Sequence, residues 1–302
     1  MRFDDPALIE TLQRIATLRP DVAALQSFDF DHDHVALQLV QSRLEELGHA
    51  MPFRFALMPN AGVFTGFDLN RDGRFDTASD RQGYGQFTGQ GGIAILSRYP
   101  IETQEAQDLS AVLWKDIPGT QIPRTYFSPE EVDALRLQSV AAWDVPIRLP
   151  SGVVHVLATQ ASSPVFDGPE NRNGLRNADQ LRFWKGYVEN MTQPFVLMGG
   201  LNNDPFDGEG LNPPLRALLG SPALQDTRPR SNPRSVQDPA HLGPTLQDTV
   251  DWGREIGSLR VDYVLPSAGL RVVESGVDWG SPERDHEDMP LHKPVWVELT
   301  MP

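Results

Sequence analysis

The sequence contains no cysteine. The absence of thiols excludes disulfide scaffolds, Cys-ligated zinc or iron–sulfur centres and thiol nucleophiles. No uninterrupted apolar stretch approaches the roughly 18 residues that a membrane helix needs, so we expect no membrane span. Basic side chains are scarce, because 26 Lys and Arg stand against 41 Asp and Glu, giving a formal net charge of -15. Affinity for polyanions comes mainly from cationic side chains, so this balance argues against nucleic acid as a partner.

The chain has 302 residues and is 39% apolar, which is enough to bury a full core. Short apolar runs alternate with amphipathic stretches, and this predicts one α/β domain over 1–302 with a long loop insertion at 60–90. The predicted helices cover about 5–16, 33–47, 174–190 and 214–220. The predicted strands cover 21–28, 92–97, 153–158, 195–198, 261–265 and 295–299.

Four short motifs occur along the chain, and their order is informative about the fold. They are Leu25-Gln26-Ser27, the run 91–101 (GGIAILSRYPI), the run 195–202 (FVLMGGLN), and 260–263 (RVDY) with His292 beyond it. Together with the loop 161–170 (ASSPVFDGPE), they resemble a bacterial branch of the endonuclease/exonuclease/phosphatase superfamily, which has the deoxyribonuclease I-like fold. The resemblance covers nearly the whole chain. It implies two packed mixed β-sheets flanked by helices in a four-layer α/β/β/α sandwich, although the family's first strand is missing here.

The resemblance also implies metal-dependent hydrolysis of a phosphodiester or phosphomonoester, with a catalytic Mg²⁺ or Mn²⁺. Several positions depart from the family pattern. The family's Glu, catalytic His, Asp and final Asp are replaced by Ser27, Gln160, Gly200 and Leu291. The catalytic residues that remain are His292, Asp262 and Asn202. Because Mg²⁺ needs hard oxygen ligands, usually carboxylates, the substitutions indicate a degraded metal site.

Three functional hypotheses remain open. The first is a phosphoesterase-like hydrolase that is weakly active or inactive, a pseudoenzyme candidate. The second is an active phosphoesterase on a small phosphorylated substrate, in which a rearranged site recruits Asp29, Asp31, Asp204 or Asp207. The third is a non-catalytic binding module built on the same sandwich. A sheet that lacks a strand exposes an edge, so homodimerisation through that edge is a further expectation.

An acidic loop gives a signal independent of the resemblance. Its oxygen-bearing and turn positions match most of a calcium-binding loop. The residues are Asp68, Asn70, Asp72, Arg74 and Asp76, with Gly73 at the sharp turn and Asp80 one place beyond the usual end. We expect structural Ca²⁺ here; the alternative is a solvated acidic turn. Calcium binding slightly favours an extracytoplasmic setting, although the first residues contain no signal peptide and the compartment stays unknown.

A pair of arginines opens the helix predicted near 174–190. Arg172 and Arg176 are four residues apart, so both can face one anion near the helix N-terminus. The alternative is that they engage neighbouring carboxylates such as Asp167 or Glu170.

Overall fold

The computed structural model describes residues 5–232, 240–253, 256–280 and 291–301. The α-helices are α1 (Pro6–Leu18), α2 (Val35–Glu46), α3 (Pro129–Ala134), α4 (Arg172–Asn190) and α5 (Asn212–Leu219). Short 3-10 helices are η1 (Ala78–Asp80), η2 (Trp114–Asp116) and η3 (Thr245–Gln247). The strands are β1 (Val22–Phe28), β2 (Phe53–Phe55), β3 (Gly92–Ser97), β4 (Gln107–Asp108), β5 (Ala141–Leu149), β6 (Gly152–Gln160), β7 (Phe195–Gly200), β8 (Val250–Asp251), β9 (Ser258–Leu259), β10 (Asp262–Pro266), β11 (Arg271–Val277) and β12 (Val295–Thr300).

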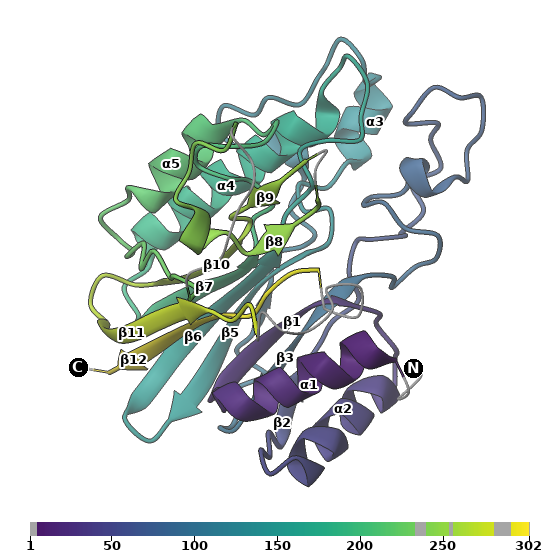
Figure 1. The fold of residues 1–302 in the computed structure, drawn as a ribbon. Helices are drawn as coiled ribbons and strands as arrows, with labels where there is room; N and C mark the ends of the chain where they lie inside the picture. The colour runs from purple at the N-terminus through teal and green to yellow at the C-terminus, as the bar shows by residue number, and fades with distance from the viewer. Residues whose placement is uncertain (1–4, 233–239, 254–255, 281–290, 302) are drawn as a thin grey trace.

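Two principal sheets pack against each other and helices cover their outer faces (Figure 1). The smaller sheet has the order β1-β3-β2 and the larger has the order β10-β7-β6-β5-β4. Only β6 and β7 are parallel within the larger sheet, because α4 provides the crossover between them. β11 and β12 form a separate antiparallel pair, as do β8 and β9. The predicted class, two packed mixed sheets flanked by helices, is confirmed.

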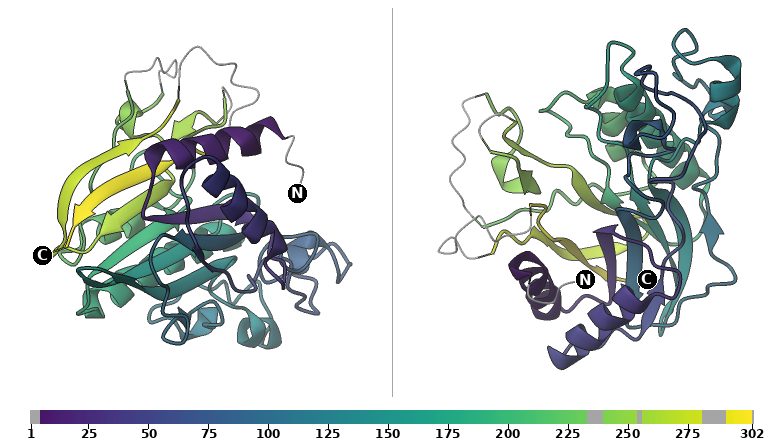
Figure 2. Two further views of the ribbon diagram at one scale, coloured as in Figure 1. Left: turned by 90° about the horizontal axis from the view of Figure 1, so that it is seen from below. Right: turned by 90° about the vertical axis from the view of Figure 1, so that its right-hand side faces the viewer.

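The hydrophobic residues form one core between the sheets and another under α4 and α5. Phe55 of the smaller sheet meets Trp143 of the larger one edge to face, with ring centroids 5.3 Å apart. The first core continues to α1 and α2 through Leu12, Leu37 and Leu44. The second contains Leu181, Trp184, Leu215, Leu218, Leu157 and Leu197. Burial of these apolar faces therefore fixes the layer order that Figure 2 shows from two further sides.

Two long strands escaped the sequence analysis. β5 contains Pro146, which cannot donate to a ladder and normally argues against a central strand. β11 carries Arg271 and Glu274 on exposed positions, so its apolar pattern is weak. In the part of the chain that is described, no helix has the length and apolarity required to cross a bilayer.

Candidate phosphoester site

The register of the larger sheet places three of the expected site positions in one row. Gly200 at the end of β7 lies between Gln160 of β6 and Asp262 of β10. β1 of the smaller sheet ends at the same place, where the backbone N–H of Ser27 donates to Gln160 Oε1 at 3.4 Å. Residues far apart in sequence therefore meet at one end of the sandwich, as the motif order predicted.

Asp262 and His292 form a hydrogen-bonded pair, and Thr249 supplies a second donor to the Asp262 carboxylate. His292 Nδ1 lies 2.8 Å from Asp262 Oδ2, and the Thr249 hydroxyl donates to the same oxygen at 2.8 Å. Burial lowers the pKa of His292, but the hydrogen bond and charge of Asp262 outweigh it, so the pKa lies above its ordinary value. The ring is therefore biased towards the cation, and its Nε2 is left to face a ligand.

Thr249 was not recognised in the sequence. Its hydroxyl also accepts from the backbone N–H groups of Val261 and Asp262, at 3.0 and 3.1 Å. Thr249 is fully buried and lies 13 residues before Asp262, beside the short strand β8. The only signal that could have revealed it is the polar Asp248-Thr249 step before the apolar Val250, and such steps are common in loops.

Glycine has different consequences at two adjacent positions. A Cβ on Gly199, whose φ is +133°, would lie 1.9 Å from the carbonyl oxygen of Thr159, so only glycine fits there. A Cβ on Gly200 would meet Asp262 Oδ1 at 3.6 Å and Asn202 Oδ1 at 3.7 Å, which is ordinary contact. Position 200 therefore has room for a side chain aimed at the site and presents none.

The side chains at this end do not fit a divalent cation. Asn202 donates its amide to the carbonyl of Ala161 at 2.6 Å, and Asp262 Oδ2 already accepts from His292 and Thr249. Ser27, Gln160 and Gly200 add no carboxylate. Across the described ranges, no group of three or more His, Asp or Glu side chains could hold a metal ion. Among the described residues, this donor set therefore has fewer charged oxygens than Mg²⁺ sites usually have.

The four carboxylates that could have replaced the missing ligands all accept hydrogen bonds from backbone amides, although Asp204 and Asp207 also line the cavity. Asp204 is 4% exposed and accepts backbone N–H groups from Phe206, Asp207 and Arg260 at 2.7 to 2.9 Å. Burial of Asp204 raises the pKa of its carboxyl. The other three also accept from backbone amides, Asp207 from residues 242 and 243, Asp29 from residue 91, and Asp31 from residues 35 and 36. Each carboxylate holds a turn in place, and this argues against a rearranged metal site.

A cavity of about 2000 Å³ opens at these residues and continues between the sheets. All seven expected site positions line it, including Leu291, which is 49% exposed. The Trp252 ring meets the His292 ring edge to face at 5.7 Å. Further apolar side chains at the rim are Phe166 and Ile256, which are both exposed. The pocket can therefore receive a ligand at His292, and its lining is mostly apolar with polar and charged side chains of both signs, Lys293 among them.

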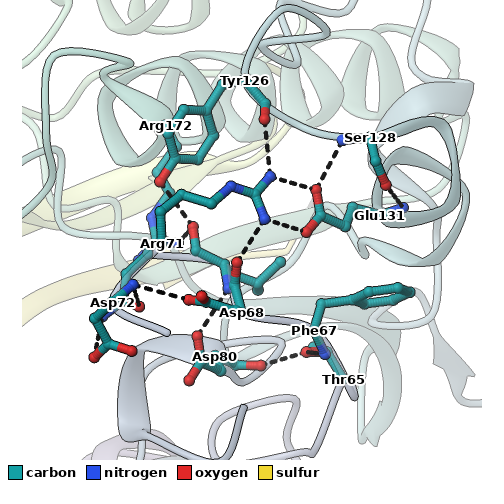
Figure 3. A network of polar contacts seen from close by, with 12 residues as sticks. Thr65, Phe67, Asp68, Arg71, Asp72, Asp80, Tyr126, Ser128, Glu131 and Arg172 are labelled. Atoms are coloured by element: carbon teal, nitrogen blue, oxygen red, sulfur yellow. Dashed lines mark hydrogen bonds and ion pairs between the residues drawn. The ribbon is translucent and has the colours of Figure 1, made fainter. Parts of the chain in front are cut away.

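The acidic loop is stabilised by its own hydrogen bonds (Figure 3). Asp68 accepts from the backbone N–H groups of Asp72 and Gly73, at 3.1 and 2.9 Å. Arg71 binds both carboxylate oxygens of Glu131, at 2.5 and 2.6 Å, and also donates to the carbonyl of Asp68 at 2.6 Å. This tie fastens the loop to the start of α3.

Asp80 is buried and binds the backbone of the same loop. It is fully buried, and its two oxygens accept from the backbone N–H groups of Leu69 and Thr77, at 2.8 and 3.0 Å, and from the Thr77 hydroxyl. Burial raises the pKa of Asp80, but these hydrogen bonds outweigh it and leave the pKa below its ordinary value. The side-chain oxygens from Asp68 to Asp76 therefore remain as the proposed ligands of the turn. Asp80 instead takes part in the capping box of the 3-10 helix η1.

The two arginines of α4 point into the protein. Arg172 donates to the carbonyls of Leu69 and Ser79, at 2.9 and 3.4 Å. Arg176 donates to the carbonyls of Leu137 and Arg136, and burial lowers the pKa of its guanidinium to about 9. Both groups hold loop backbone, and anion binding by the pair stays a prediction.

The fold and site together define a class. Two packed sheets with an Asp–His pair at their ends are the architecture of the deoxyribonuclease I-like phosphoesterases. Residues 2–295 match the model of the Endonuclease/Exonuclease/phosphatase family, and the chain belongs to that family. No curated protein matches the sequence.

Solved structures show the same fold. An endonuclease/exonuclease/phosphatase from Beutenbergia cavernae is 19% identical, with a TM-score of 0.58 over 99% of this chain and 67% of that one. A family protein from Leptotrichia buccalis is 16% identical, with a TM-score of 0.56 over 97% and 92%. A Neisseria 3′ phosphatase bound to a product DNA hairpin is 16% identical, with a TM-score of 0.51 over 97% and 94%.

Proposed function

We propose that this protein is a phosphoesterase-family member whose catalytic metal site is degraded, so that it hydrolyses phosphoesters weakly or not at all. The observation that carries the proposal is the row Gln160, Gly200 and Asp262, in which the middle position faces the site without a side chain. Losing one charged group of such a site commonly costs about 100-fold or more in rate. The turns formed by Asp204 and Asp207 support the same proposal, because both carboxylates already accept backbone hydrogen bonds that a cation would compete with.

The active alternative rests on the retained pair. A cationic His292 oriented by Asp262 can contact a phosphoryl oxygen or donate a proton to a leaving group. Any substrate would be a small phosphorylated molecule, because a protein with a net charge of -15 repels a long polyanion. If the site shows no turnover, the third hypothesis remains, in which the protein is a module that binds such a ligand without hydrolysing it.

The deciding experiment compares the wild-type protein with His292→Ala. Release of p-nitrophenol from bis-p-nitrophenyl phosphate and p-nitrophenyl phosphate is measured with Mg²⁺, Mn²⁺ or Ca²⁺. We expect equal, near-background rates for the two proteins. Metal-dependent turnover that disappears in His292→Ala would establish the active alternative.

We also propose that the turn from Asp68 to Asp76 binds Ca²⁺ weakly and structurally. The convergence of Asp68, Asn70 and Asp72 on backbone N–H groups of one turn supports it, because these are the oxygens of the first three ligand positions. Asp80 stands outside the proposed ligand set, so the affinity should be in the range of weak extracellular sites.

A further inference from the structure

The loop that follows β6 is anchored at the strand-end site. The backbone N–H of Ala161 donates to the carbonyl of Gly200 at 2.8 Å, and the carbonyl of Ala161 accepts the side-chain amide of Asn202 at 2.6 Å. Residues 163–166 of this loop line the same pocket as His292. The loop therefore leads directly from the strand ends to the wall of the pocket.

Phe166 in this loop combines an unfavourable backbone conformation with an exposed side chain. Its φ is +67°, and it is the only apolar side chain with a positive φ among the described residues. The left-handed region is strained for a bulky residue, because its Cβ crowds the neighbouring backbone. The side chain is 85% exposed, the largest fraction of any large apolar side chain that the structure describes. Packing of the ring therefore does not offset the strain.

Asn173 of α4 holds Phe166 in this conformation from both sides. The side-chain amide of Asn173 donates to the carbonyl of Val165 at 2.8 Å, and its backbone N–H donates to the Asp167 carboxylate at 2.5 Å. The residues before and after Phe166 are thus fixed to the first turn of the same helix. Strained residues persist where surrounding contacts over-determine them, and they cluster at ligand sites. The contacts of Asn173 therefore favour a functional role for the displayed ring.

The charge of the protein gives a phosphate ester little long-range attraction. A net charge of -15 opposes the approach of an anion, so contact with the organic group of the ester becomes important for its affinity. Three exposed large apolar side chains line the pocket and are placed to make such a contact, namely Phe166, Ile256 and Leu291. Phe166 is the only aromatic side chain of the three, and an aromatic ring distinguishes planar from saturated groups.

We propose that Phe166 is a specificity-determining residue, which stacks against a planar aromatic group attached to the phosphate of the ligand. The inference rests on the proposed phosphoester pocket at His292 and names the class of ligand that this pocket takes. Aryl phosphates and nucleoside monophosphates share this chemistry. The fixed backbone pre-organises the ring, which lowers the entropic cost of the contact. An aromatic pair contributes beyond the apolar area that it buries, by roughly two- to tenfold in affinity.

The test measures binding to the full chain by NMR titration, with phenyl phosphate and cyclohexyl phosphate as matched ligands. Both esters carry one phosphate and a carbocyclic ring of the same size, but only the phenyl ring is planar and aromatic. We expect phenyl phosphate to bind about three- to tenfold more tightly, with NOEs between its ring protons and the ring of Phe166. Titration with adenosine monophosphate then shows whether a nucleoside or an aryl group is the preferred source of the ring.

Substitutions at position 166 separate the contribution of the ring from that of the backbone. Phe166→Tyr keeps an aromatic ring and should keep the preference for phenyl phosphate. Phe166→Leu has the same backbone strain without an aromatic ring, and it should bind both esters equally. Phe166→Gly should also lose the preference but raise the Tm, because glycine adopts a positive φ without strain.

Three results would overturn the proposal: equal affinity of the wild type for the two esters, a preference that Phe166→Leu retains, or no binding of phenyl phosphate. A dimeric mass by light scattering that Phe166→Gly abolishes would overturn it in favour of a contact between two copies. Metal-dependent turnover of phenyl phosphate would instead contradict the proposed loss of activity, and the binding preference would still decide the role of the ring. If a variant fails to fold, the comparison of the two esters on the wild type decides.

Discussion

The acidic loop and the strand-end site use carboxylates in opposite ways. Asp80 in the loop is fully buried and Glu131 of α3, which binds the loop, is 4% exposed; both oxygens of each carboxylate accept hydrogen bonds. At the strand ends, Gly200 faces the cavity without a side chain and Ser27 offers only a hydroxyl. Among the described residues, carboxylates thus hold backbone in the loop, whereas positions 27 and 200 at the strand ends carry none.

The comparison shows that family membership and chemistry are carried by different residues. The layers depend on apolar packing such as Phe55 against Trp143, which is indifferent to the side chain at position 200. The Asp262–His292 pair persists because Thr249 and two backbone N–H groups build it into the sheet. The fold therefore keeps the Asp262–His292 pair at strand ends where Ser27 and Gly200 carry no carboxylate.

Restoring the missing carboxylates should produce the largest effect. The double variant Gly200→Asp with Ser27→Glu should hydrolyse bis-p-nitrophenyl phosphate with Mn²⁺ at least about 100-fold faster than the wild type, because two hard ligands return. Space favours both changes: a Cβ at position 200 makes only ordinary contacts, and Ser27 is exposed. Initial rates across Mn²⁺ concentrations measure the gain.

The matched control is Gly200→Asn with Ser27→Gln, which has nearly the same shape without charge. It should remain at the wild-type rate. An equal gain in the control, or none in the carboxylate variant, would mean that the defect of this site lies elsewhere than in its ligands.

Removing the Asp80 carboxylate, which supports the loop, should have the next-largest effect. Expressed as a free energy, the loss of stability should be nearly as large as the rate gain above. Asp80→Ala leaves the backbone N–H groups of Leu69 and Thr77 without their acceptor in a buried place. We expect a loss of about 2 to 3 kcal/mol in the free energy of unfolding. Urea denaturation followed by circular dichroism measures it, and Asp76→Ala, on an exposed position, should change it by less than about 0.5 kcal/mol.

The sequence predicted the frame of the site better than its details. The apolar runs placed β7 and β10, and the motif order placed Asp262 with His292, because strand ends and their register follow from hydrophobic pattern. Thr249 escaped because its role depends on a fold that brings β8 beside β10. The burial of Asp80 was not predicted for a similar reason. Asp80 lies one residue beyond the usual ligand position, and the sequence does not show the backbone groups that bind its carboxylate.

Calcium should have a smaller effect than either substitution. If the turn from Asp68 to Asp76 binds Ca²⁺ in the weak range, millimolar Ca²⁺ stabilises the folded chain by about 1 kcal/mol. Thermal melts with 5 mM CaCl₂ against 5 mM MgCl₂, roughly the range in which such weak sites fill, check the shift. Asp72→Asn should abolish the difference. Identical melts in both salts would identify the loop as a solvated acidic turn.

The smallest expected effect is the contribution of the Asp262–His292 pair to the pH dependence of stability. Asp262 raises the pKa of His292, so the pair stabilises the folded state while the ring is protonated. This contribution to the free energy of unfolding is complete below the ordinary pKa of about 6.5 and is lost as the pH rises through the raised pKa. The His292 side chain is 45% exposed, so solvent screening limits the contribution to below about 1 kcal/mol. The difference in unfolding free energy between wild type and His292→Gln should therefore be larger near about pH 5.5 than near about pH 9. A difference that grows with pH instead would mean that the neutral ring is the form the fold prefers, and the pair could not present a cation to phosphate.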